Sequence, residues 1–96
     1  MRDARFISPS DVRLYYFGSK DVLSQPNERE SRERKLKRAM VLTNSAHQAI
    51  SIYIQLPTGE RLETQSDLVT YTDTDNYVIV KGGYTIPVSA IVDIDI

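Results

Sequence analysis

The chain has 96 residues, of which 41% are hydrophobic, and a formal net charge of −1. This length predicts one domain with a thin core, for which oligomerisation is a common supplement. The lack of cysteine excludes a disulfide framework, a thiol nucleophile and thiolate metal sites. No apolar run reaches the roughly 18 residues of a membrane span, and no hydrophobic stretch follows the first charged residues as in a secretory signal. We therefore expect a cytoplasmic protein with no membrane partner.

Charge is divided unevenly along the chain. Residues 1–47 hold ten Lys/Arg and six Asp/Glu, a balance of +4, whereas residues 48–96 hold two and seven, a balance of −5. Such asymmetry is typical of a nucleic-acid-binding arm. A basic helix that pairs with an acidic barrel of the same or a neighbouring subunit explains it equally well.

Residues 1–27 are interpreted as an N-terminal arm. Ser8 as N-cap, Pro9 at the first helical position and Gly18 as the stop predict a short helix over 9–17. The β-forming residues between 12 and 17 argue for an extended segment instead.

A longer helix is predicted over about 28–42. Asn27 is the expected cap, and Glu30 lies three residues on, as in a capping box. The first two turns carry no apolar face and are expected to lie in solvent. The stripe that can pack on a core is made by Leu36, Ala39, Met40 and Thr43.

Five short strands follow, within 48–96. Alternation or apolar runs place them at 49–56, 60–66 with a bulged continuation through 68–71, 77–80, 84–88 and 91–96. The unbroken apolar run at 77–80 predicts burial of both its faces. Pro87 has no N–H to donate, so it is expected at a bulge or on a non-bonding side.

This order predicts a mostly β fold with α: a five-stranded, strongly bent antiparallel barrel of SH3 type, preceded by a helix. An OB-fold would need a helix between its third and fourth strands, where only residues 81–83 are available. The leading helix favours the Sm-like arrangement.

Three stretches carry a family resemblance: Ile50–Ile54 with the turn at Gly59–Leu62, Asp75–Lys81, and Tyr84–Ile91. They resemble the Sm/LSm family and its Hfq-like bacterial branch, which implies an Sm-like domain over 28–96. In that family the fourth strand of one subunit pairs with the fifth strand of the next to form a ring. Pro87–Ser89 stands where the family keeps its basic RNA-binding residues, and Thr64 stands where it often bends the strand with Gly.

We therefore expect a non-catalytic ring of about five to seven subunits that binds single-stranded RNA or DNA. The expected phosphate contacts on the helix are Arg29, Arg32, Arg34, Lys35, Lys37 and Arg38. The expected contacts at the pore or face are Asn76, Tyr77 and Lys81. The expected subunit interface consists of Tyr84, Ile86, Val88, Ile91, Val92 and Ile94.

Two alternatives stay open. Tyr77 can instead belong to the barrel core, with Asn76 capping the turn. The whole chain can instead be a protein-interaction or scaffolding module with no nucleic-acid role, contacting partners through acidic residues such as Asp67, Asp73 and Asp75. An enzyme is not expected, because the sole histidine, His47, has no partner pattern and no cofactor or metal-ligand spacing is present.

Overall fold

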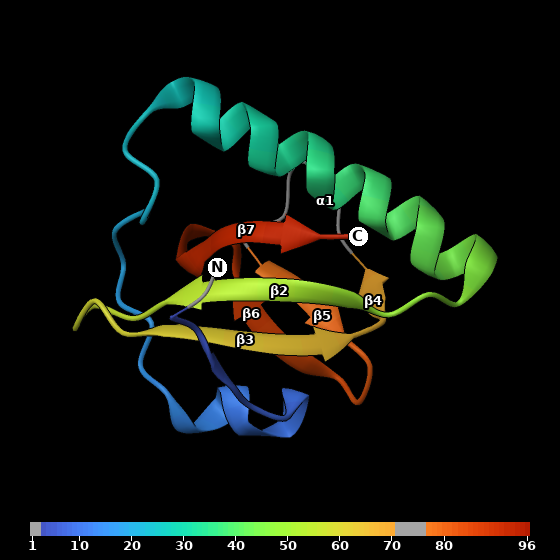
Figure 1. Ribbon diagram of the computed structural model, residues 1–96, viewed down its shortest axis with the longest axis horizontal. Helices are drawn as coiled ribbons and strands as arrows, with labels where there is room; N and C mark the ends of the chain where they lie inside the picture. The colour runs from blue at the N-terminus through green and yellow to red at the C-terminus, as the bar shows by residue number, and fades with distance from the viewer. Residues whose placement is uncertain (1–2, 71–76) are drawn as a thin grey trace.

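The computed structural model describes residues 3–70 and 77–96, and it has a mixed α/β architecture of one long helix and short strands in two sheets (Figure 1). In chain order the elements are β1 (Arg5–Phe6), the 3-10 helix η1 (Pro9–Leu14), α1 (Pro26–Ala46), β2 (Ile50–Gln55), β3 (Arg61–Ser66), β4 (Leu68–Thr70), β5 (Tyr77–Val80), β6 (Tyr84–Pro87), the 3-10 helix η2 (Val88–Ala90) and β7 (Ile91–Asp95).

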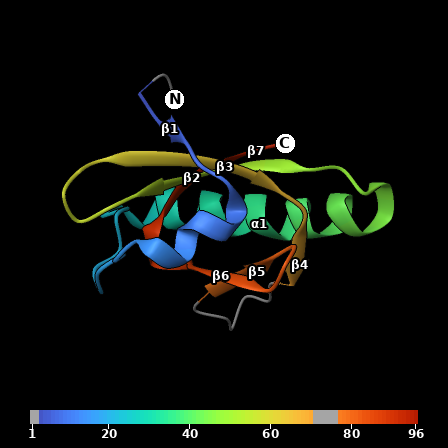
Figure 2. The ribbon, with the colours of Figure 1, turned by 90° about the horizontal axis from the view of Figure 1, so that it is seen from below.

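The strands form two sheets that lie over one another (Figure 2). One has the order β1-β3-β2-β7 and the other β4-β5-β6. All neighbours are antiparallel except β1, which runs parallel to β3. No pairing joins the two sheets within the described residues, so the expected barrel is not closed.

The sharp change of direction between the sheets lies at Asp67. This residue alone separates β3, which pairs with β2, from β4, which pairs with β5. The register of β4 also shifts between Leu68 and Thr70. The predicted strand over 68–71 is present as Leu68–Thr70, with residue 71 outside the described residues, and it has an irregular register. It does not continue the β2–β3 pairing, because the bend carries the chain from one sheet into the other.

The core lies between the sheets. Ile52 and Ile54 of β2 are fully buried, as the alternation predicted. Val78 and Val80 of β5 are also fully buried, but Tyr77 beside them is 49% exposed. The prediction that both faces of 77–80 are buried is therefore wrong, because the core covers only one side of the second sheet.

Two helices fill opposite sides of the space between the sheets. Leu36 and Ala39 of α1 are fully buried, and α1 contacts β4 and β7. On the other side η1 contacts β6 and β3, and its Val12 is 1% exposed. Ile7 belongs to the same core. The segment interpreted as a separate arm thus supplies core residues to the domain.

The long helix begins earlier and ends later than the predicted 28–42. Pro26 occupies the first turn, and the N-cap is Gln25 without a side-chain hydrogen bond, so the capping assigned to Asn27 is wrong. The helix ends at His47, whose left-handed φ of 52° closes the last turn through a hydrogen bond from its N–H to the carbonyl of Thr43.

Thr64 is fully buried in β3, and its hydroxyl has no hydrogen-bond partner among the described residues. Replacing this hydroxyl by a methyl group removes an unsatisfied polar atom at nearly constant volume. We predict that Thr64→Val raises the free energy of unfolding by about 1 kcal/mol, measured by urea denaturation. Thr64→Ser keeps the hydroxyl and loses a buried methyl, so it should lower stability. A Thr64→Val variant less stable than wild type would show that the buried hydroxyl has a hydrogen-bond partner.

Candidate functional site at the two strand edges

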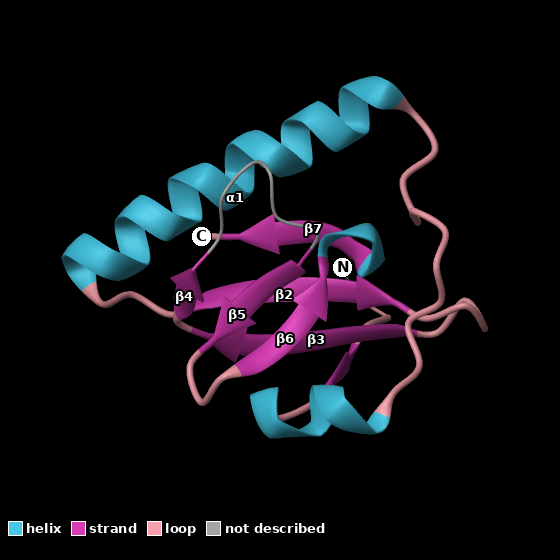
Figure 3. Ribbon diagram, turned by 180° about the vertical axis from the view of Figure 1, so that it is seen from behind, coloured by secondary structure: helices cyan, strands magenta, loops and turns pink. Residues whose placement is uncertain are grey.

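The two last strands each end a sheet. β7 is the outer strand of one sheet and β6 of the other, so each presents one side that no described strand pairs. Unpaired strand edges are the usual places where another chain adds a strand. A helix borders each edge: α1 lies along β7, and η1 lies beside β6 (Figure 3).

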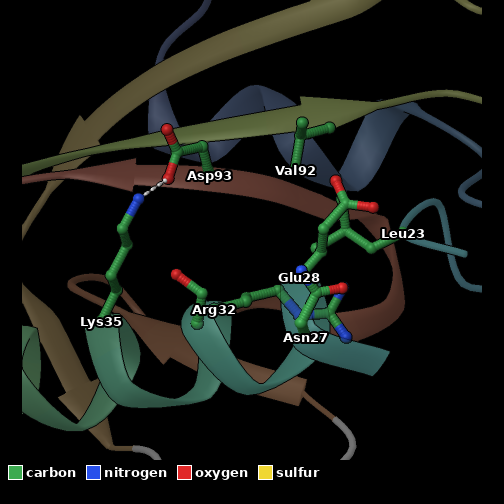
Figure 4. A pocket seen from close by; sticks show the side chains of 8 residues that line it. Leu23, Asn27, Glu28, Arg32, Lys35, Val92 and Asp93 are labelled. Carbon is green, nitrogen blue, oxygen red and sulfur yellow. Dashed lines mark hydrogen bonds and ion pairs between the residues drawn. The ribbon is translucent and has the colours of Figure 1, made fainter. Parts of the chain in front are cut away.

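A polar groove of about 380 Å³ separates α1 from β7 (Figure 4). Glu28, Arg32 and Lys35 line it from the helix, and Val92 and Asp93 line it from the strand. This groove contains two of the cations that the sequence assigned to phosphate contacts.

Arg32 is held in the wall of the groove. Its side chain is 6% exposed and makes two hydrogen bonds to the Asp21 carboxylate, of 2.8 Å from Nη1 and 2.6 Å from Nη2. Nη1 also donates to the carbonyl oxygen of Ile91 at 3.1 Å. The prediction that Arg32 contacts phosphate does not fit this burial, because its donors already hold a carboxylate and a strand carbonyl.

Asp21 lies in the loop before α1, and its carboxylate accepts several hydrogen bonds. The Leu23 N–H donates to Oδ1 at 2.9 Å, and the Arg29 guanidinium lies 3.6 Å from Oδ2. Burial by itself raises the pKa of Asp21, but the hydrogen bonds from Arg32 and Leu23 and the two positive charges outweigh it and lower the pKa below its usual value. Arg29 also donates to the carbonyl of Leu23 at 2.7 Å.

Asp93 occupies a second point on the same edge. Its Oδ1 accepts hydrogen bonds from Lys35 Nζ at 2.6 Å and from the Ile94 N–H at 2.8 Å. The carbonyl of Ile91 and the amide of Ile94 are therefore both satisfied by side chains. Charged side chains placed this way protect an edge strand from unwanted pairing.

The edge of β6 has a different character. A mainly apolar groove of about 300 Å³ lies between it and the N-terminal segment, lined by Tyr15 and Phe17 on one side and Tyr84 and Pro87 on the other. Arg13 is the charged residue in its lining. Within residues 3–70 and 77–96, no side chain hydrogen-bonds to the backbone of β6.

The remaining helix cations divide into paired and unpaired side chains. Lys37 lies 3.1 Å from Glu33, one turn before it. Arg34 and Arg38 are exposed, and neither forms an ion pair with a described carboxylate. Only these two of the six predicted phosphate contacts are both exposed and without such a partner.

The predicted face contacts are only partly described. Tyr77 and Lys81 are exposed, which does not fit the alternative that Tyr77 belongs to the core. Asn76, Asp73 and Asp75 lie outside the described residues.

The predicted interface residues separate by burial. Ile86, Ile91 and Ile94 are buried in the subunit's own core, so their side chains do not face a neighbour. Tyr84, Val88 and Val92 are partly exposed. Strand alternation shows that one face is covered, but it does not distinguish the chain's own core from another subunit.

Acidic side chains gather on the outer face of the first sheet. Tyr53 pairs with Glu63 on one side and Asp93 on the other, and Asp95 lies two residues further along β7. Burial raises the pKa of Tyr53, and the negative charges of Glu63, Asp95 and Asp93 raise it further. Lys35 and Arg38 line the same end of β7, so acidic and basic side chains meet there.

Two residues of these edge sites, Asp21 and Arg13, were not predicted from the sequence. Asp21 is 11 residues before Arg32 and separated from it by the break at Pro26, so no helical spacing connects them. Arg13 was interpreted only as part of a short helix. A buried pair across a loop leaves no periodic signal in the sequence.

Comparisons with known proteins add no relative. No protein family, curated protein or solved structure matches this chain. In the part of the chain that the structure describes, no helix has the length and apolar character to cross a membrane. The same residues contain no cluster of three or more His, Asp or Glu side chains that would bind a metal ion.

We predict that Asp21→Asn lowers the free energy of unfolding by about 3 kcal/mol near pH 7, because it leaves the Arg32 charge buried without a counterion. The folded-state pKa of Asp21 is lowered. Its stabilising effect is therefore complete above its unfolded pKa of about 3.9 and is lost as the pH falls through the folded-state value. Urea denaturation from pH 7 to pH 3 should show wild type and variant converging in acid. Asp3→Asn, at an exposed position, is the control; equal losses in both variants would contradict the pairing.

Proposed function

We propose that this protein is a non-catalytic, cytoplasmic, Sm-like subunit that assembles head to tail into a ring of about five to seven copies. The strand connections support it. β2 pairs with β3, the chain bends at Asp67 into β4, β5 and β6 follow as hairpin partners, and a 3-10 turn leads to β7 beside β2. This is the order expected of the Sm-like arrangement, although the sheets do not close.

The observation that carries the proposal is the pair of unpaired strand edges. β6 and β7 end different sheets and are joined only by the three residues of η2. A contact between β6 of one copy and β7 of the next is heterologous, so it repeats until a ring closes. The two edges also differ in charge: Arg13 and Lys81 lie near β6, whereas β7 carries Asp95 and the Asp93 carboxylate that pairs with Lys35.

Two side chains, Arg32 and Asp93, already occupy hydrogen-bonding groups of the β7 edge, and an incoming strand must either leave them in place or displace them. Arg32 is buried and bonded to Asp21, so it remains on the Ile91 carbonyl. The Lys35–Asp93 pair is more than 40% exposed on both sides, and pairs of this kind contribute little stability. An incoming strand can therefore replace the Asp93 carboxylate at the Ile94 N–H at small cost.

We predict that light scattering coupled to size exclusion gives a mass about five to seven times the 10.9 kDa of one chain at micromolar concentration. A synthetic peptide with the sequence of residues 90–96 should compete for the β6 edge and lower this mass. A peptide of the same composition in scrambled order is the control. A mass of one or two chains would contradict the ring.

A second function is favoured by the outer surface of α1. Arg34 and Arg38 lie four residues apart, so they share one face of the helix, and both are exposed and form no ion pair with a described carboxylate. Arg38 also borders the groove that Asp93 and Asp95 line. Repeated around a ring, this pair forms a circle of positive charge. Such a surface suits the phosphates of single-stranded RNA or DNA, which it would bind with little regard to sequence.

We predict that the double variant Arg34→Gln/Arg38→Gln loses salt-dependent binding of labelled single-stranded RNA and DNA, measured by fluorescence anisotropy. Removing two phosphate contacts should lower the slope of log K against log salt by about 1.4 per subunit engaged. Lys37→Gln, at a lysine already paired with Glu33, should keep most of the binding. Equal binding by wild type and the double variant would exclude this face.

A further inference from the structure

The groove beside β6 has a size and chemistry that suit one apolar side chain next to one acid. It measures about 300 Å³ and is lined by the aromatic rings of Tyr15, Phe17 and Tyr84, with Arg13 in its wall. Arg13 donates from Nε to the carbonyl of Ser10 at 3.2 Å and pairs with no carboxylate in the described residues. The groove thus combines an apolar surface with an unneutralised positive charge.

The far end of β7 presents the complementary pair. Asp95 is exposed, and Ile96, just beyond the strand, is 42% exposed. Ile96 is one of the few large hydrophobic side chains that this fold leaves in solvent. Asp95 forms no ion pair with a described cation, whereas Asp93 is bonded to Lys35. Lys35 and Arg38 line the groove in which Asp95 lies.

Strand addition would bring these features together. If β7 of one copy pairs antiparallel with β6 of the next, the end of β7 lies against the beginning of β6. That beginning is Tyr84, which lines the groove together with Gly83 just before it. The residues that follow β7 would therefore reach the groove mouth.

We propose that the groove between β6 and the N-terminal segment is the receiving site for a second copy of this chain. The Ile96 side chain of one copy packs against Tyr15 and Phe17 of the next, and Asp95 pairs with Arg13. This inference rests on the proposed ring, and it names the contact that fixes the register of the two strands. It also assigns a role to the N-terminal segment, which builds one wall of the site.

Complementary charge provides the specificity of this contact. An Arg13–Asp95 pair at the groove rim excludes a register shifted by one residue, because that shift moves Asp95 to the opposite face of the strand. Ile96 lies beyond the last residue of β7, so strand alternation does not fix the direction of its side chain. Burial of Ile96 supplies the apolar part, since exposed apolar side chains of this size gain most from leaving water. Charge pairs at such a rim set partner choice more than affinity.

A charge-exchange cycle on the full chain tests the proposal, with mass measured by light scattering over a concentration series. Arg13→Glu alone and Asp95→Arg alone should each raise the concentration for half-assembly about tenfold or more, through like-charge repulsion. The double variant Arg13→Glu/Asp95→Arg should restore assembly toward wild type. Circular dichroism verifies that each variant is folded.

A matched pair of apolar substitutions tests the other half of the contact. Ile96→Ser should weaken assembly, whereas Val41→Ser, at a 66% exposed position on α1, should leave it unchanged. If wild type assembles and neither the charge cycle nor Ile96→Ser changes the mass, this contact is wrong while the ring survives. If wild type is a monomer at all concentrations, both the proposed ring and this contact are wrong.

Discussion

The structure depends on filling the two open sides between its sheets. A strand path that bends at Asp67 lays one sheet over the other but leaves the apolar interior open along both flanks. Leu36 and Ala39 of α1 cover the flank between β4 and β7, and Val12 of η1 covers the flank between β6 and β3. A small domain has little core to lose, so both helices are part of the fold and neither is an appendage.

The same requirement explains the buried ion pair. Placing α1 against β7 brings its second turn over the beginning of the strand, where Arg32 donates to the Ile91 carbonyl. A guanidinium at this depth needs a counterion, and Asp21 supplies one from the segment leading into the helix. The pair anchors the beginning of α1, which has no side-chain cap of its own. The pair fixes the position of the helix, but it bonds to no N–H group of the first turn, as a capping box would.

Local sequence patterns predicted the helices and strands much better than they predicted which distant residues pack against each of them. Alternation at Ile50–Ile54 and the stripe at Leu36 and Ala39 are direct consequences of strand and helix periodicity, and both are buried as predicted. Arg32 was misassigned because most of its neighbours in sequence are charged, and the carboxylate that pairs with it in the buried site belongs to another segment. The closed barrel was wrong for a related reason: periodicity gives a buried face, but whether a strand or a helix covers a flank depends on distant residues.

The helices that complete the core also define how the edges can be used. Beside β7, α1 places Arg32 and Lys35 at the strand, so that edge is polar and some of its backbone groups are already bonded to side chains. Beside β6, the N-terminal segment places Tyr15 and Phe17, so that edge is apolar and open. The proposed pairing of unlike edges fits this difference, because a polar edge with paired charges at β7 is unlike the mainly apolar edge with Arg13 at β6. The proposed head-to-tail association would use the two strand edges that remain unpaired when α1 and the N-terminal segment seal the core.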